Sequence, residues 1–301
     1  MNKQPLVSLI LVVENGMPYI KQAIRSVQQQ TYGNIELIVQ DGKSTDGTLE
    51  FLQNLTGIKN IQIKSEPDNS QADGWNRALK RCKGQIIGSI DADNILKREA
   101  LEIITKLFKK NPQVAAIYGT SKLIDNYGKV IQKGRGKEVV KPFNLIRLMR
   151  CELVPPFASS FFDAILCKEK LYCDERMETC WDFDLWLRLS DLPITATGSV
   201  LSYTRRHQNS STCRPENYEK FCLNKIYALK KYLSRFPQDK PLMALYQFSV
   251  AGIYTWAAES IYGLEGTSRR FNYFGKKALF FDAYSERISQ LKLYAQNNAP
   301  L

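Results

Sequence analysis

The first half of the chain repeats short aliphatic runs, and the segments between them have apolar residues at helical spacing. The aliphatic runs lie at residues 6–13, 35–39, 61–63, 85–90 and 114–118. The helical segments lie near residues 20–27, 49–55, 72–82 and 101–108. A continuous apolar run is typical of a strand buried on both faces. Because strand–helix–strand units fold into a mostly parallel sheet flanked by helices, the sequence predicts an α/β fold.

The second half departs from this alternation. Residues 126–150 are rich in glycine and in lysine and arginine, and we expect a mobile basic loop there. Regular structure is expected again at residues 159–166, 182–189 and 194–203, and helices from Pro215 onward. We therefore predict an α/β domain over residues 1–214 and a helical region over residues 215–301.

Residues 241–258 carry no charged side chain, so they approach the lower limit of length for a membrane-spanning helix. Polar residues dilute the segment, among them Gln247, Ser249 and Thr255. We therefore expect a buried helix of the C-terminal region rather than a membrane span.

Cysteine usage and the N-terminus bear on the compartment. The 301-residue chain has seven cysteines and no C-x-x-C pair. This scatter resembles neither a zinc site nor a disulfide framework. No signal peptide fits the residues that precede the first aliphatic run. A reducing cytoplasm is the expected location.

The formal net charge is +12, which suits an anionic partner or simply a solvated surface. Nucleic acid, an anionic membrane surface and a phosphate-bearing substrate all meet that description. No zinc-finger spacing and no aromatic RNA-binding motif accompanies the charge, so we expect no nucleic-acid partner.

Asp91 and Asp93 stand one residue apart, directly after the apolar run at residues 85–90. From a turn at a strand end, both carboxylates can point to one region. Hard divalent cations prefer oxygen ligands and often take only one or two from protein. The alternative is that Asp93 and Asn94 cap the following helix, and for an isolated D-x-D pattern that alternative is the better one.

Three further segments carry polar groups at informative places. Asp41-Gly42 ends the second aliphatic run, where a carboxylate can accept hydrogen bonds from a base or a ribose, or where the loop merely joins strand to helix. Asp182 stands at the start of a predicted helix, either as a cap or as an ionised base. His207 is the only histidine and follows Arg205 and Arg206. It is either structural or a metal ligand beside two diphosphate-binding guanidinium groups.

The order of these segments resembles the family 2 inverting glycosyltransferases, which have the GT-A fold, and in particular their polysaccharide-biosynthesis branch. The matching segments are DGKSTDGT at residues 41–48, SEPDN at 65–69 with DGWN at 73–76, DADN at 91–94, DFDLWLR at 182–188 and YTRRHQNS at 203–210. The resemblance covers roughly residues 5–212, and the C-terminal helices lie outside it.

The resemblance implies a metal-dependent transfer of a sugar from a nucleotide-sugar donor, with Mn²⁺ or Mg²⁺ as cofactor. It assigns Asp41 to the nucleobase, Asp91 to the ribose or metal, and Asp93 and His207 to the metal. The general base would be Asp182, with Asp184 as second candidate. The remaining donor-binding residues implied are Glu14, Asp68, Asp73, Asn76, Arg205 and Arg206.

One segment departs from the family pattern. Where the family has P-T-Y-N after the first strand, this chain has Val12-Val13-Glu14-Asn15. Glu14 can accept a hydrogen bond from an amino or imide N–H of the base. The departure leaves open a second interpretation, a catalytically inactive module that binds nucleotide-sugar or glycan.

The acceptor implied is the hydroxyl of a glycan or of a lipid-linked saccharide. The basic loop at residues 129–150 would then meet a phosphorylated acceptor or the anionic inner face of the membrane. Each basic group near such a surface contributes about 1 kcal/mol to the free energy of binding. We therefore expect a cytoplasmic protein with possible peripheral membrane contact.

Overall fold

The computed structural model describes residues 4–131 and 141–282. The chain forms two compact units, each built from separate stretches. The first unit holds the residues up to Phe143, Pro155–Glu178 and Leu189–His207. The second holds Asn144–Val154, Thr179–Arg188 and the residues from Gln208 onward. The units are described separately below.

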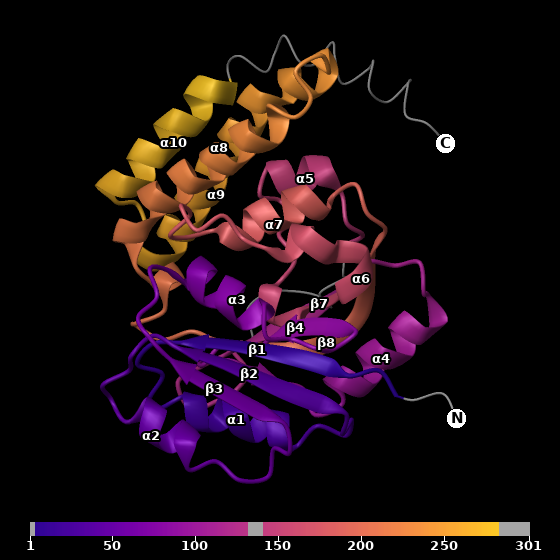
Figure 1. The fold of residues 1–301 in the computed structure, drawn as a ribbon. Coiled ribbons are helices and arrows are strands. Elements are labelled where there is room, and N and C mark those ends of the chain that lie inside the picture. The colour runs from indigo at the N-terminus through magenta and orange to yellow at the C-terminus, as the bar shows by residue number, and fades with distance from the viewer. Residues whose placement is uncertain (1–3, 132–140, 283–301) are drawn as a thin grey trace. The chain divides into compact units, whose positions relative to one another are not determined.

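An eight-stranded sheet forms the centre of the first unit, in the order β3-β2-β1-β4-β7-β6-β8-β5 (Figure 1). The strands are β1 (Val7–Val13), β2 (Ile35–Asp41), β3 (Ile61–Ser65), β4 (Ile86–Ser89), β5 (Ile95–Leu96), β6 (Ala116–Ile124), β7 (Ser160–Asp163) and β8 (Ile194–Arg205). Strand β1 pairs in parallel with β2 and β4, β2 with β3, and β6 with β8. The β4–β7, β6–β7 and β5–β8 pairs are antiparallel. The sheet is thus mixed, with parallel pairing throughout its N-terminal half.

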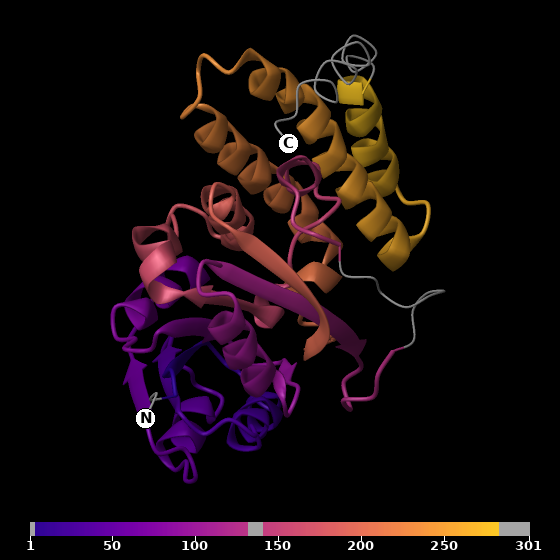
Figure 2. The ribbon, with the colours of Figure 1, turned by 90° about the vertical axis from the view of Figure 1, so that its right-hand side faces the viewer.

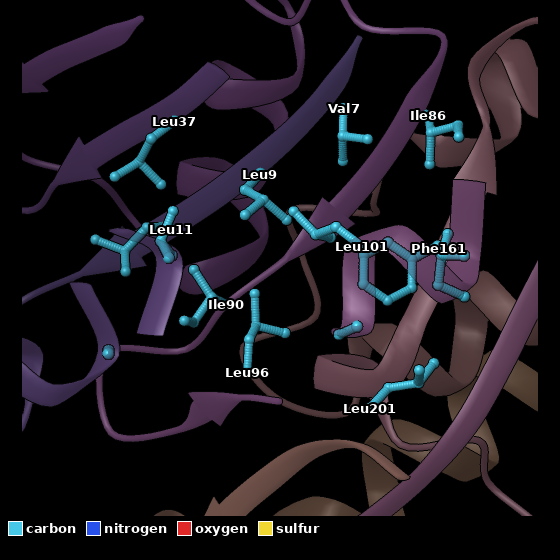
Figure 3. Packing of buried hydrophobic residues seen from close by; sticks show 14 of the residues in the cluster. Val7, Leu9, Leu11, Leu37, Ile86, Ile90, Leu96, Leu101, Phe161 and Leu201 are labelled. Carbon is cyan, nitrogen blue, oxygen red and sulfur yellow. The ribbon is translucent and has the colours of Figure 1, made fainter. Parts of the chain in front are cut away.

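Buried aliphatic side chains join one face of this sheet to two helices (Figure 3). The helices of the unit are α1 (Ile20–Gln28), α2 (Thr48–Gln53), α3 (Gln71–Leu79), α4 (Ala100–Lys110) and the short α6 (Ala164–Cys167). Val7, Leu9 and Leu11 alternate along β1 and pack in one cluster with Ile24 of α1 and Leu101 of α4. These side chains are at most 1% exposed. Their burial contributes about 1.5–3 kcal/mol each and fixes which face of β1 points to the core.

Register brings the polar strand ends to one edge of the sheet. Val13 is opposite Asp41, and Asp41 is opposite Ser65. Ile10 is opposite Ser89, two residues before Asp91. The loops that follow β1, β2, β3 and β4 therefore start along one edge, where ligands of open α/β sheets bind.

The second unit is helical. Its helices are α5 (Leu145–Met149), α7 (Trp181–Leu189, up to Arg188 in this unit), α8 (Tyr218–Leu233), α9 (Lys240–Glu265) and α10 (Arg269–Asp282). Helix α9 packs against α5, α8 and α10, and α9 and α10 run side by side in orange and yellow in Figure 2. Within the described residues no helix is long and apolar enough to cross a membrane. The uncharged segment at residues 241–258 forms part of α9, as expected of a helix in the C-terminal region.

The α/β fold with C-terminal helices is confirmed. The predicted domain boundary near Pro215 stays a prediction. The longest stretch of the second unit begins at Gln208, and this unit also takes in two earlier segments. The basic stretch at 126–150 includes helix α5, and its residues 132–140 lie outside the described part of the chain.

Candidate active site

The loops after β1 and β2 are tied together by side chains. Asn15 has a left-handed backbone, and its side-chain oxygen accepts from the Thr45 amide at 2.9 Å, while the Ser44 hydroxyl accepts from the Asn15 amide at 2.8 Å. Between these loops Asp41 is fully buried at the end of β2. Its carboxylate accepts a 2.6 Å hydrogen bond from the Ser65 hydroxyl. The first predicted base-binding residue is therefore held rigidly by its neighbouring strand.

Glu14 and Asp68 lie on either side of Gly42. A methyl group placed on Gly42 would lie 3.3 Å from Asp68 Oδ2 and 3.3 Å from Glu14 Cβ. Burial, and then the nearby carboxylates of Asp73 and Glu14, raise the pKa of Asp68. Several acids thus gather at the end of β2, where carboxylates are hydrogen-bond acceptors only.

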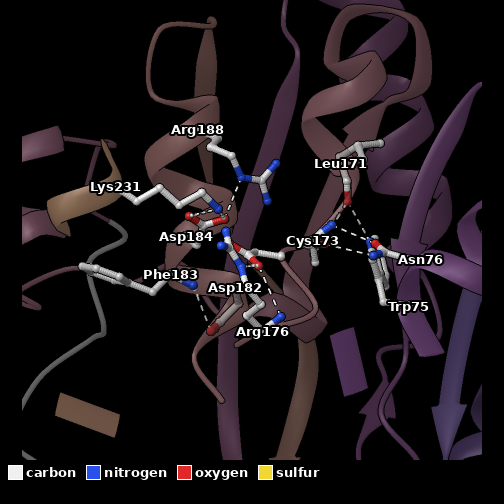
Figure 4. A network of polar contacts seen from close by, with 11 residues as sticks. Trp75, Asn76, Leu171, Cys173, Arg176, Asp182, Phe183, Asp184, Arg188 and Lys231 are labelled. Carbon is white, nitrogen blue, oxygen red and sulfur yellow. Dashed lines mark hydrogen bonds and ion pairs between the residues drawn. The ribbon is translucent and has the colours of Figure 1, made fainter. Parts of the chain in front are cut away.

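Asp73 and Asn76 on helix α3 contact protein groups. Asp73 accepts hydrogen bonds from Arg77 at 2.6 and 2.8 Å and from the Asn69 amide at 3.0 Å. Burial opposes its charge, but the Arg77 hydrogen bonds outweigh burial and lower the pKa of Asp73. Asn76 donates to the Cys173 carbonyl at 2.9 Å and accepts from the Cys173 amide at 2.7 Å (Figure 4). The hydrogen bonds of both side chains are made to protein groups, and they tie helix α3 to the segments at residues 69 and 173.

Asp91 and Asp93 lie in a turn between β4 and β5. The Asn94 side chain donates to Asp91 Oδ2 at 2.7 Å, and its oxygen accepts from the Arg205 amide at 3.0 Å. His207 Nε2 lies 3.1 Å from Asp93 Oδ2, and its ring lies against Tyr19 with centroids 4.7 Å apart. The fold therefore brings together two predicted metal ligands that are 114 positions apart in the chain.

Arg205 is 2% exposed and its guanidinium is engaged by protein. It donates to the carbonyls of Asp93 at 3.0 Å, Asp125 at 2.7 Å and Asn126 at 2.9 Å, and to Gln22 at 2.6 Å. We assign it a positioning role, because these bonds hold the turn of Asp93 and the start of the His207 segment. Arg206, in contrast, is exposed.

The pair Asp93 and His207 fits a divalent cation. Two neighbouring ligands of an octahedral ion, each at about 2.1 Å, lie about 3 Å apart, which matches the observed separation of their donor atoms. Asp91 lies in the same turn. Among the described residues, no three histidine, cysteine or acidic side chains already form a metal-binding group. The remaining ligands would come from diphosphate and water, as is usual for Mg²⁺ and Mn²⁺.

In the second unit, Asp182 and Asp184 stand two positions apart on α7. Asp184 is 1% exposed and forms ion pairs with Arg188 at 2.7 Å and Lys231 at 3.2 Å (Figure 4). Asp182 accepts from the Phe183 amide at 2.9 Å, and burial raises the pKa of its carboxyl. The carboxylate of Asp184 is thus engaged in ion pairs with two cations. This favours Asp182 as the carboxylate available to accept a proton.

Several residues of these networks escaped the sequence analysis. Ser65, Tyr19 and Gln22 contact Asp41, His207 and Arg205, and Lys225 is buried with its Nζ atom over the Trp256 ring. The only sequence signal was the place of Ser65 in the SEPD segment. The others depend on contacts between residues far apart in the chain.

The first unit combines a mixed sheet flanked by helices with an acidic turn after a central strand, and a histidine contacts that turn. This arrangement is that of the GT-A glycosyltransferase fold. The family model "Glycosyl transferase family 2" matches residues 8–168. The chain belongs to that family.

Curated relatives include a hyaluronan synthase of Pasteurella multocida, 29% identical over 195 residues, which covers 64% of this chain and 19% of that protein. A chondroitin synthase of Escherichia coli is 27% identical over 193 residues, with 64% and 27% covered. The chain therefore matches only about a fifth to a quarter of the length of these relatives.

Two solved structures share the fold. Staphylococcus aureus TarS 1–349 in complex with UDP-GlcNAc has a TM-score of 0.61 at 17% identity, covering 95% of this chain and 92% of that chain. The mannosyltransferase PcManGT of Pyrobaculum calidifontis, in complex with GDP-Man and Mn²⁺, has a TM-score of 0.64 at 15% identity, covering 95% and 87%. At such identities these likenesses support the fold alone.

Proposed function

We propose that this protein is a metal-dependent, inverting glycosyltransferase that moves a sugar from a nucleotide-sugar donor to a hydroxyl of a glycan or lipid-linked saccharide. The observation that carries the proposal is the convergence of Asp93 and His207, 3.1 Å apart, at the edge of the sheet where Asp41 also lies. Family membership supports it.

Asp91, Asp93 and His207 would hold Mn²⁺ or Mg²⁺, and the exposed Arg206 would meet the diphosphate. When bound, the cation would neutralise charge on the departing diphosphate. Arg205 would keep the Asp93 turn in place through its hydrogen bond to the Asp93 carbonyl. Positioning and charge neutralisation of this kind are the main tools of group transfer from phosphates.

Asp182 would accept the proton of the acceptor hydroxyl. The hydroxyl oxygen then attacks the anomeric carbon, a new carbon–oxygen bond forms, and the bond to the diphosphate oxygen breaks. The configuration at the anomeric carbon inverts, and the nucleoside diphosphate leaves with the bonding electron pair. A positioned base of this kind contributes about 10²–10⁴-fold to the rate.

The acids at the base-binding end favour a nucleobase with several N–H donors. Asp41, Asp68 and Glu14 are acceptors when ionised, whereas uracil offers one N–H between two carbonyl groups. Guanine offers an imide N–H and an amino group side by side. We therefore expect tighter binding of a guanosine than of a uridine diphosphate.

The test is a panel of nucleotide-sugars incubated with the purified protein and Mn²⁺, with released nucleotide as the readout. We expect turnover of one donor, and loss of that turnover in Asp93→Ala. Binding of a nucleotide-sugar without turnover of any donor, with and without saccharide acceptors, would instead support the inactive binding module. The basic loop is tested by co-sedimentation with anionic vesicles, before and after neutralising Lys129 and Lys141.

A further inference from the structure

Tyr19 directly precedes helix α1 in the first unit. Its carbonyl oxygen accepts hydrogen bonds from the amides of Gln22 at 2.9 Å and Ala23 at 3.2 Å, so the first turn of α1 fixes its backbone. The next residue, Ile20, is fully buried and anchors this turn in the core. Tyr19 is therefore carried by a rigid element, although its own side chain is partly exposed.

Two side chains at the end of β8 lie against the ring of Tyr19. The guanidinium carbon of Arg205 lies 4.8 Å from the ring centroid. The His207 ring lies 4.7 Å away, centroid to centroid, with the two planes tilted by 41°. At such distances an aromatic face attracts a cation or a second ring. Arg205 also donates to the side-chain oxygen of Gln22 at 2.6 Å, so the start of α1 contacts the end of β8 at more than one point.

The same two side chains reach the proposed cation site. His207 Nε2 lies 3.1 Å from Asp93 Oδ2, and Arg205 donates to the Asp93 carbonyl at 3.0 Å. Tyr19 is thus linked directly to one proposed metal ligand, His207. Through Arg205 it is also linked to the backbone of the other, Asp93.

Fixing a histidine before a ligand arrives has a physical consequence. An unpacked imidazole samples several rotamers, and binding a cation would then have to select one of them. A ring already packed in its bound rotamer avoids that entropic cost, which is the basis of preorganised binding sites. The Tyr19 contacts are contacts of its ring, so a phenylalanine at this position can make them as well.

We propose that Tyr19 is a positioning residue for the cation site: its ring fixes the His207 imidazole beside Asp93, so that both donor atoms are in place before a divalent cation binds. This inference rests on the proposed function, in which Asp93 and His207 hold Mn²⁺ or Mg²⁺.

The test uses Mn²⁺ alone and untagged protein labelled in histidine, at about pH 8, because a metal-bound imidazole must be unprotonated. His207 is the only histidine in the chain, so its imidazole NMR signals need no assignment. Bound Mn²⁺ broadens signals of nearby nuclei, and the concentration that gives half of the broadening measures the affinity. We expect Tyr19→Leu to need about three- to tenfold more Mn²⁺ than the wild type, since its aromatic contacts are lost.

Two matched variants separate the ring from a general loss of structure. Tyr19→Phe keeps the ring and should require as much Mn²⁺ as the wild type. Tyr127→Leu removes a tyrosine that is 90% exposed in the same unit and should also leave the requirement unchanged. Without Mn²⁺, the imidazole protons of Tyr19→Leu should shift toward the values of an unstacked histidine, because the ring current of Tyr19 is gone. Those of Tyr19→Phe should stay in place.

An equal Mn²⁺ requirement in the wild type and Tyr19→Leu, or an equal loss of affinity in Tyr19→Phe, would overturn the inference. If Tyr19→Leu does not fold, Tyr19→Met replaces it under the same expectations. The proposed cation site fails separately: Mn²⁺ would then leave the wild-type signals sharp, or broaden them equally in Asp93→Asn.

Discussion

The chain contains two D-x-D pairs with the same spacing and different surroundings. Asp91 and Asp93 lie in a turn, where Asp93 meets His207 at 3.1 Å. Asp182 and Asp184 lie on a helix, where residues two positions apart point to different sides. There Asp184 forms ion pairs with Arg188 and Lys231, while Asp182 accepts a hydrogen bond from the Phe183 amide. The backbone that carries the two acids, not their spacing, decides which neighbours each carboxylate meets.

The largest effect is expected at the turn. Asp93→Asn removes the charge of the proposed metal ligand beside His207, so we expect transfer to fall by about 10³-fold or more. Donor turnover with saturating Mn²⁺ measures this. Asp191→Asn, an exposed acid paired with Lys170, is the matched control and should stay within about twofold of the wild type.

On the helix, Asp182→Asn should reduce kcat for transfer by about 10²–10⁴-fold, because the acceptor proton loses its base. Nucleotide binding measured by calorimetry should be retained, since the residues proposed to bind the donor lie in the first unit. Equal losses of binding in Asp182→Asn and Asp93→Asn would mean that the two pairs do not differ in role.

Asp184 should matter for stability. Asp184→Asn leaves Arg188 and Lys231 without their shared carboxylate, and Arg188 is 17% exposed in its side chain. We expect a loss of about 2 kcal/mol in the free energy of unfolding, less than for a fully buried pair because Lys231 is partly solvated. Urea denaturation measures it, and an unchanged midpoint would show that this ion pair contributes nothing.

A smaller effect concerns pH and the acid on α3. Burial opposes the charge of Asp73, but Arg77 lowers its pKa below the ordinary value of 3.8. Its ionised form therefore stabilises the fold above that value, and the contribution is lost as pH falls toward the lower folded pKa. Asp73→Asn should cost about 1–2 kcal/mol at pH 7, and the difference from the wild type should shrink below about pH 4. If Arg77 did not favour the ionised form of Asp73, the difference in unfolding free energy between the wild type and Asp73→Asn would stay constant across this pH range.

The strands were predictable because a strand buried on both faces is a continuous apolar run, as at residues 6–13. The order of the motifs can be read directly from the sequence. The pairing of β7 was not predictable, because an isolated run of four residues carries no sign of antiparallel direction. The roles of single residues were also hidden. Arg205 matched a donor-binding motif, yet Gln22, 183 positions away, is one of the partners that engage its guanidinium.

The D-x-D comparison also shows what a motif leaves out. The sequence favoured Asp182 through its place at a helix start and through resemblance, whereas the ion pairs of Asp184 give a reason that depends on the fold. Lys225 had no sequence signal, because a lysine on an amphipathic helix is normally exposed. Its burial depends on Trp256, which lies on another helix.

The most direct test is calorimetric titration of nucleoside diphosphate into the purified protein, with and without Mn²⁺, for the wild type, Asp93→Asn and Asp182→Asn. We predict Mn²⁺-dependent binding to the wild type and to Asp182→Asn, with guanosine diphosphate bound more tightly than uridine diphosphate, and at least tenfold weaker binding to Asp93→Asn. Binding that is indifferent to Mn²⁺ and to Asp93 would contradict the assignment of the turn at Asp91 and Asp93 as the donor site.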